Sequence, residues 1–179
     1  MMKIGIISDS HGSFALTKKA VQYLRNEGVG LIVHLGDVLY HGPRNPIPPF
    51  YDPPKLAEFL KGIEGLIVLR GNCDSDVDQT VIGRRFPDSM AISLDEDRLA
   101  ILGHVKENVV GFPGNVFIYG HTHVPEVERK DGKIYLNPGS VSLPKDGNPP
   151  TFVMLDLERK VGIFISVENL NVLRMFPLT

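Results

Sequence analysis

The hydrophobic pattern begins with three short runs that lie far apart in the first third of the chain. They occupy Ile4–Ile7, Leu31–Leu35 and Leu66–Leu69. Runs of four or five largely apolar residues are typical of strands that are buried on both faces. The segments between them are long enough to hold a helix each, so the pattern predicts parallel strands joined by crossovers.

Both intervening segments carry helical signals. Phe14–Asn26 has apolar residues at approximately helical spacing, with Ser13 as a candidate N-cap and Gly28 as the residue that ends the helix. A shorter helix is expected to begin at Asp52-Pro53-Pro54 and to run through Leu60. The chain therefore begins as a βαβαβ unit with right-handed crossovers.

The second half changes character, because short strand patterns follow one another with few helical patterns between them. Hairpin signals such as Asp95-Glu96-Asp97 and Lys130-Asp131-Gly132 join several of these patterns. The expected strands are Met90–Leu94, Arg98–Leu102, Val116–Tyr119, Val124–Glu128, Lys133–Leu136, Thr151–Leu155 and Gly162–Val167. They indicate a second sheet packed on the first. The predicted fold class is α/β, a two-sheet β-sandwich flanked by helices in a four-layer αββα order.

Two segments, Val38–Tyr51 and Gly139–Pro150, have no regular pattern and are rich in proline and glycine. Long loops at the carboxyl ends of strands usually carry the function of an α/β fold. We therefore expect these two segments to border the functional site.

Length, charge and cysteine content narrow the class of protein. The 179 residues are about the size of one domain, so we expect a single domain over residues 1–179. Lys and Arg total 19 against 21 Asp and Glu, and no nucleic-acid-binding surface is evident. The only cysteine, Cys73, cannot form an intramolecular disulfide. The N-terminus is too short in apolar residues for a signal peptide and no segment approaches a membrane span, so we expect a cytoplasmic protein without a membrane partner.

Polar residues with metal-ligand chemistry follow the apolar runs in order down the chain. In a parallel sheet the carboxyl ends of neighbouring strands lie side by side, so Asp9, Asp37 and Asn72 should converge on one rim. The full series is Asp9, His11, Asp37, Asn72, His104, His121 and His123. Each motif alone is weak, but five of them in order at strand ends favour a site for two divalent metal ions, which is a site suited to phosphate-ester chemistry.

The ligand types indicate which ions would bind. Carboxylates bind hard divalent ions and imidazoles suit transition metals, so the mixture favours Mn, Fe, Co or Zn over Ca or Mg. An aspartate placed between two ions can give one oxygen to each, and we assign this bridging role to Asp37.

The motif set resembles that of the calcineurin-like metallophosphoesterases. The matching residues are Asp9-x-His11, Gly36-Asp37, Gly71-Asn72-Cys73-Asp74, Gly120-His121-Thr122-His123 and Asn137-Pro138-Gly139-Ser140. Within this family the chain is similar to the small bacterial and archaeal phosphodiesterases of the YfcE type, through the loop around His41–Asn45 and through Ser142-Leu143-Pro144-Lys145. The resemblance covers residues 3 to 156.

The resemblance implies a division of the ligands into two sets. One ion would be held by Asp9, His11, Asp37 and His123, and the other by Asp37, Asn72, His104 and His121. Mn is the favoured metal, with Zn, Fe, Co and Ni as alternatives. A metal-bridging hydroxide would attack phosphorus in line.

Further roles carry over from the same resemblance. Asn72 would touch both a metal and the substrate phosphate, and Arg44 would donate to a phosphate oxygen. Asp74 is expected to orient or deprotonate the attacking water or to protonate the leaving group. Cys73 would line the pocket, and Asp37, Asn72, Asp74 and His104 are the expected catalytic group.

One departure from the family pattern leaves two alternatives open. The family usually writes Thr-His-Gly-His after this strand, whereas the chain reads Leu102-Gly103-His104-Val105. In one alignment His104 is the metal ligand and the strand is one residue longer. In the other Leu102 occupies the ligand position and one metal site lacks a ligand. We favour His104.

Four functions are considered. The leading hypothesis is a metal-dependent phosphodiesterase acting on a small phosphodiester. The alternatives are a non-catalytic scaffold that binds proteins, like the metallophosphoesterase-like subunit of retromer, and a phosphomonoesterase or nucleotide hydrolase. A nuclease is disfavoured by the short chain and its lack of basic charge. The resemblance also implies a homo-oligomer, either a dimer or a tetramer.

Overall fold

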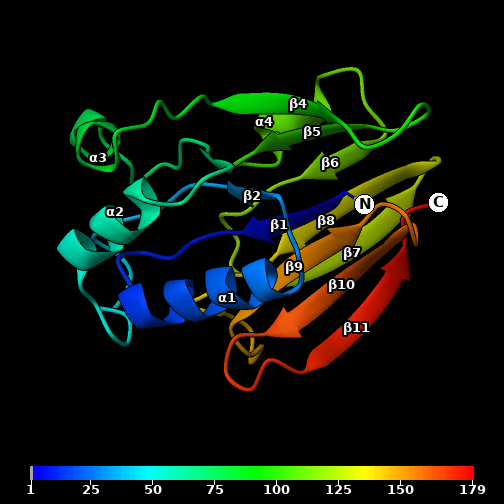
Figure 1. Ribbon diagram of the computed structural model, residues 1–179. Helices are drawn as coiled ribbons and strands as arrows, with labels where there is room; N and C mark the ends of the chain where they lie inside the picture. Colours follow the sequence, from blue (N-terminus) through cyan, green and yellow to red (C-terminus); the bar gives the residue numbers. More distant parts are fainter. Residues whose placement is uncertain (1) are drawn as a thin grey trace.

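The computed structural model describes residues 2–179 as two facing β-sheets with helices outside them (Figure 1). The elements of the first half are β1 Lys3–Ile7, α1 Phe14–Asn26, β2 Leu31–His34, α2 Pro53–Lys61, β3 Leu66–Val68, α3 Asp76–Ile82, β4 Ser89–Ser93 and β5 Leu99–Gly103. Those of the second half are α4 Glu107–Val110, β6 Val116–Ile118, β7 Pro125–Lys130, β8 Lys133–Pro138, β9 Thr151–Asp156, β10 Val161–Ser166 and β11 Val172–Pro177.

The two sheets are both mixed. The first has the strand order β11-β10-β9-β1-β2-β3, in which β1, β2 and β3 run parallel, and β9, beside β1, is antiparallel to it. The second has the order β4-β5-β6-β8-β7, with β5, β6 and β8 parallel. The predicted βαβαβ beginning is therefore confirmed, and so is the α/β two-sheet class.

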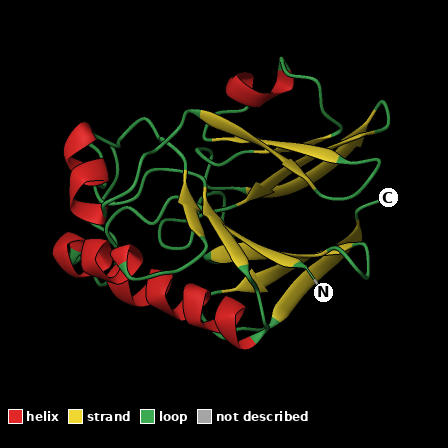
Figure 2. Cartoon of the chain, turned by 45° about the horizontal axis from the view of Figure 1, so that its top comes forward, coloured by secondary structure: helices red, strands yellow, loops and turns green. Residues whose placement is uncertain are grey.

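Buried side chains form a core between the two sheets, a core between the first sheet and its helices, and a smaller cluster beside α4 that includes Val109 and Phe117. Ile6, Val33 and Leu102 belong to the core between the two sheets. Leu24 of α1 and Leu56 of α2 belong to the core between the first sheet and its helices. The three longer helices all lie on this side, whereas, among the described residues, the outer face of the second sheet carries only the single turn of α4 (Figure 2). The fourth layer of the predicted αββα order is thus reduced to one short helix.

The elements that the sequence pattern did not predict are α3, α4 and β11. Helix α3 begins with a capping box, because the Ser75 hydroxyl accepts from the Asp78 amide and the Asp78 carboxylate accepts from the Ser75 amide. Strand β11 is an edge strand that is exposed at most positions, so it has no alternating pattern. Ser13 does occupy the N-cap position of α1, but its hydroxyl donates to the Pro49 carbonyl and does not cap the helix.

None of the helices in residues 2–179 is both long and apolar enough to cross a membrane. The parallel strands of the two sheets end toward a common rim. The loops that follow β1, β2, β3, β5 and β6 carry the residues described next.

Candidate metal centre

The loops at this rim have an unusual backbone. Five of the predicted metal ligands have positive φ angles, a region that side-chain-bearing residues enter at a cost and that is often populated at functional sites. They are Asp9 (54°), His11 (45°), Asp37 (57°), His121 (67°) and His123 (62°). The tight turns bring their side chains back over the ends of the strands.

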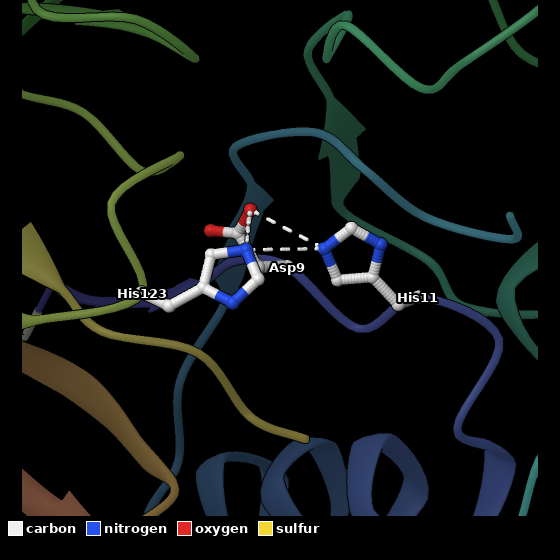
Figure 3. Close-up of side chains that lie close together, drawn as sticks. All are labelled: Asp9, His11 and His123. Atoms are coloured by element: carbon white, nitrogen blue, oxygen red, sulfur yellow. Dashed lines mark hydrogen bonds and ion pairs between the residues drawn. The ribbon is translucent and has the colours of Figure 1, made fainter. Parts of the chain in front are cut away.

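Asp9, His11 and His123 form the first cluster, and all three are buried (Figure 3). The two Nε2 atoms lie 3.2 Å apart, and the Asp9 Oδ1 atom lies 3.3 Å from Nε2 of His123 and 3.8 Å from Nε2 of His11. On the far side of each ring, the His11 Nδ1 donates to the Tyr40 carbonyl at 2.8 Å and the His123 Nδ1 donates to the Leu143 carbonyl at 2.6 Å.

These outer hydrogen bonds fix the tautomers of both rings. With each proton on Nδ1, a neutral imidazole has only a lone pair on Nε2. Both lone pairs and the Asp9 Oδ1 therefore face one another, and Asp9 Oδ1 is a buried oxygen without a hydrogen-bond partner among the described residues. Buried acceptors that converge without a proton between them are suited to a cation.

The electrostatics of this cluster agree with a cation site. Burial lowers the pKa of His11, which keeps the ring neutral and able to ligate. Burial alone would raise the pKa of Asp9, but the neighbouring His123 and His104 and the Ser8 hydroxyl hold it below its usual value, so the carboxylate is charged. The Ser8 hydroxyl and the His121 amide both donate to the other oxygen, Oδ2, so Oδ1 is the oxygen that can bind a cation.

Asp37 lies between the first cluster and a second one. Its Oδ2 is 3.8 Å from the His11 Nε2 and 3.5 Å from the His104 Nε2, while its Oδ1 accepts from the Cys73 amide at 2.8 Å. The approach of the loop after β3 requires glycine, because a Cβ on Gly71 would lie 2.1 Å from the Asp37 Oδ1. Asp37 is thus the carboxylate that is shared by both groups of potential ligands.

His104, His121 and Asn72 complete the second cluster around Asp37. The His104 Nδ1 donates to the Leu35 carbonyl at 3.1 Å, so its Nε2 faces the Asn72 Oδ1 at 3.1 Å and the Asp37 Oδ2. The His104 and His121 rings lie edge to face with centroids 5.2 Å apart. Asp37, His104 and His121 thus bring three potential ligand atoms close together.

The register of strand β5 favours the alignment in which His104 faces the site. The strand extends to Gly103, one residue later than predicted, and pairs with β6 up to Leu102. Leu102 packs in the core between the sheets, whereas the buried His104 ring faces Asp37. Burial lowers the pKa of His104, but contact with Asp37 and the charge of Asp9 outweigh this effect and raise it to about 9. A metal ion would therefore have to displace a proton from this ring.

The hydrogen bonds of Asp74 differ from those that its expected role requires. Its carboxylate accepts from three backbone amides, those of Asp37 (2.8 Å), Val38 (2.8 Å) and Gly71 (2.7 Å), and it is not part of the pocket wall. Burial raises its pKa to about 6, against the effect of these donors, so it is ionised at neutral pH. The expected contact with the attacking water or the leaving group does not match this placement. The contacts are those of a group that holds Asp37 in position.

A pocket of about 650 Å³ opens over both clusters. Arg44, Asn72 and Cys73 line it, as do Tyr40 and Lys145, to which the sequence analysis gave no role. Burial and the charge of Asp37 raise the pKa of the Cys73 thiol to about 12, so this residue is a neutral wall residue and not a nucleophile. The loops 38–51 and 139–150 both contribute to the wall, as their irregular pattern indicated.

Hydroxyl groups of Ser140 and Ser142, to which the sequence analysis gave no individual role, hold the loop after β1. Ser140 and Ser142 both donate to the Asp9 carbonyl, at 2.7 and 3.1 Å. Behind this loop, the His34 Nδ1 accepts from the Gly36 amide, so its Nε2 donates to the Ser10 hydroxyl at 2.7 Å. These contacts join residues distant in sequence. The motifs that begin at Asn137 and at Ser142 included the two serines, but no spacing rule indicates their hydrogen bonds to Asp9.

The fold and the site together define a family. Residues 2–160 match the calcineurin-like phosphoesterase superfamily domain. The chain belongs to this superfamily, as its motifs indicated.

Among its relatives is the phosphodiesterase YfcE of Escherichia coli K12, which is 43% identical over 164 residues, covering 87% of this chain and 88% of the relative. The solved structure of this phosphoesterase superposes with a TM-score of 0.91 at 36% identity over 99% of this chain and 100% of that chain. A phosphodiesterase of Methanocaldococcus jannaschii is 27% identical over 174 residues, covering 89% of this chain and 95% of the relative. Vps29 of Entamoeba histolytica, solved with Zn²⁺, shares the fold with a TM-score of 0.68 at 17% identity, covering 99% of this chain and 100% of that chain.

Proposed function

We propose that this chain is a phosphodiesterase that holds two divalent transition-metal ions at the rim described above, with Mn as the favoured ion. The observation that carries the proposal is the first cluster, in which the buried Asp9 Oδ1 has no hydrogen-bond partner among the described residues and faces the Nε2 atoms of His11 and His123. The ligand sets are Asp9, His11, Asp37 and His123 for one ion, and Asp37, Asn72, His104 and His121 for the other.

The chain's own residues have separable tasks in this proposal. Carbonyl groups accept from the Nδ1 atoms of His11, His104 and His123, so each Nε2 is aimed at the site before any ion arrives. The Nε2 of His104, whose pKa is raised to about 9, carries a proton that a metal ion would displace. Asp37 gives the carboxylate that both sets share. When bound, two ions would lower the pKa of a water molecule and offset charge on the phosphate.

The substrate phosphate would lie in the pocket over the two clusters. Asn72 is exposed at its edge, where its amide can reach a phosphate oxygen, and Arg44 offers a fork of donors from the loop after β2. The thiol of Cys73 contributes an uncharged surface to the pocket wall. The relative named a phosphodiesterase, at 43% identity over most of both chains, supports a diester as the substrate in preference to a monoester.

The proposal is tested by comparing bis(4-nitrophenyl) phosphate with 4-nitrophenyl phosphate after Mn²⁺ loading. We expect faster turnover of the diester, and loss of turnover after chelation with recovery when Mn²⁺ is returned. Faster turnover of the monoester would point to a phosphomonoesterase. Metal binding without turnover of either ester would support the scaffold alternative.

A further inference from the structure

Two cationic side chains line the pocket without an anionic partner. Arg44 and Lys145 are both exposed, and they come from different loops, 38–51 and 139–150. Within residues 2–179, no carboxylate lies at ion-pair distance from either of them. Among the described residues that line this pocket, Arg44 and Lys145 are the two that carry a Lys or Arg side chain.

Lys145 is held beside the metal cluster by its backbone. Its amide donates to the carbonyl of His123 at 3.3 Å, and its own carbonyl accepts from the amide of Asn148 at 3.1 Å and from the Asn148 side chain at 2.9 Å. The lysine therefore projects from a fixed turn. Its ammonium group can reach an arm of a bound ester, because its Cα is tied to a ligand residue of the first cluster.

The balance of charges in the loaded site indicates which kind of group Lys145 would bind. In the proposed enzyme, the charge of two divalent ions is matched by Asp9, Asp37, a deprotonated water and the single charge of a phosphodiester. Asp74 lies behind the site and its charge is met by three backbone amides. That balance already uses the single charge of the diester, so the charges of Arg44 and Lys145 both lack a counterpart in a simple diester. Arg44 can donate to the ester phosphate, which leaves Lys145 to bind a further anionic group.

We propose that Lys145 recognises a second anionic group, a phosphate or a carboxylate, on one ester arm of the substrate. This inference rests on the proposed diesterase function and narrows its substrate class. The pocket of about 650 Å³ has room for such an arm, because it is far larger than a phosphate group. Lys145 would bind this arm and set specificity without taking part in bond cleavage.

Three matched substrates test the inference: the 4-nitrophenyl diesters of phosphate whose second arm is ethyl, 2-carboxyethyl or 2-phosphonoethyl. We expect kcat/KM to be about fivefold higher or more with an anionic arm, which corresponds to one partly exposed ion pair. The advantage should shrink as ionic strength rises from about 0.05 to about 0.5 M. A larger gain with the phosphonate than with the carboxylate would assign the second group as a phosphate, and equal gains or a larger carboxylate gain would assign it as a carboxylate.

Substitutions at position 145 test whether the preference for an anionic ester arm depends on Lys145. Lys145→Met should bring the ratio of anionic-arm to ethyl-arm kcat/KM close to one, whereas Lys145→Arg should retain it. The matched control is Lys61→Met, at the exposed end of α2 away from the pocket, which should keep the wild-type ratio. A preference that survives Lys145→Met, or no preference in the wild type, would overturn the inference.

A binding measurement separates this inference from the diesterase proposal. Calorimetry would compare ethyl methylphosphonate with 2-carboxyethyl methylphosphonate, using wild type and Lys145→Met, before and after Mn²⁺ loading. A Lys145-dependent gain in affinity would support the inference even if no diester were hydrolysed. Hydrolysis of diesters with equal affinity for both ligands would leave the diesterase proposal standing and refute the role of Lys145.

Discussion

Replacing Asp74 by Asn tests whether this carboxylate positions Asp37 or takes part in the chemistry. In the structure its Oδ2 accepts from the amides of Asp37 and Gly71, and its Oδ1 accepts from the amide of Val38. An asparagine can keep its oxygen on the first pair, but its NH₂ group then faces the Val38 N–H. One buried donor loses its partner, and the two remaining hydrogen bonds lose their charge.

The size of the effect follows from these three contacts. A buried N–H without an acceptor costs about 1–3 kcal/mol. The loss of charge assistance adds to this cost, and relief from burying a carboxylate, whose pKa is raised to about 6, partly offsets it. We expect a net loss of about 2–3 kcal/mol in the free energy of unfolding, or roughly 4–12 °C in Tm for a chain of this size. Looser placement of Asp37 should also lower kcat/KM by about 10–100-fold.

The free energy of unfolding and the Tm of Asp74→Asn would be measured by denaturant and thermal unfolding, and its kcat/KM by steady-state kinetics. Asp131→Asn is the matched control, because Asp131 lies in the exposed β7–β8 turn and asparagine tolerates its positive φ. The control should unfold and turn over like the wild type. If Asp74→Asn kept wild-type stability but lost all activity, Asp74 would act in proton transfer and the positioning argument would be wrong.

Two further predictions concern the carboxylate at the centre of the site and a buried histidine behind it. Asp37→Asn should lower kcat with the diester by about a thousandfold or more, since a catalytic component shared by both ions is lost; normal turnover would refute the shared role. Burial lowers the pKa of His34 from 6.5 to about 4, so the unfolded chain takes up a proton first as the pH falls. The contribution of His34 to stability should drop by on the order of 3 kcal/mol between pH 6.5 and pH 4. Unfolding titrations of His34→Gln should lack this part of the slope, and an unchanged slope would contradict the assignment.

The local hydrophobic pattern was sufficient to predict the elements whose buried positions are occupied by regularly spaced or consecutive apolar residues. The apolar runs of β1, β2 and β3 predicted parallel strands because both faces of that sheet are covered. Helix α1 was predicted with its observed bounds, Phe14–Asn26, because its apolar residues repeat at helical spacing. The convergence of Asp9, Asp37 and Asn72 on one rim followed from the parallel arrangement alone.

Elements and contacts that depend on tertiary partners could not be predicted from the local sequence pattern. Strand β11 is exposed at most positions and pairs only with β10, so its sequence shows no alternation. The placement of Asp74 depends on three backbone amides, two of them in a distant loop, and no spacing rule shows that its oxygens are already engaged. The position of Lys145 at the pocket depends on a hydrogen bond to His123, which the irregular loop pattern does not indicate.

The most direct test of the two-ion site is anomalous diffraction from crystals soaked in Mn²⁺. The account predicts two peaks roughly 3.5–4 Å apart, with Asp37 between them. A ring nitrogen of His104 should lie roughly 2.0–2.3 Å from one of them. No peak, or a single peak with the Asp37 carboxylate and the His104 ring turned away from it, would contradict the account.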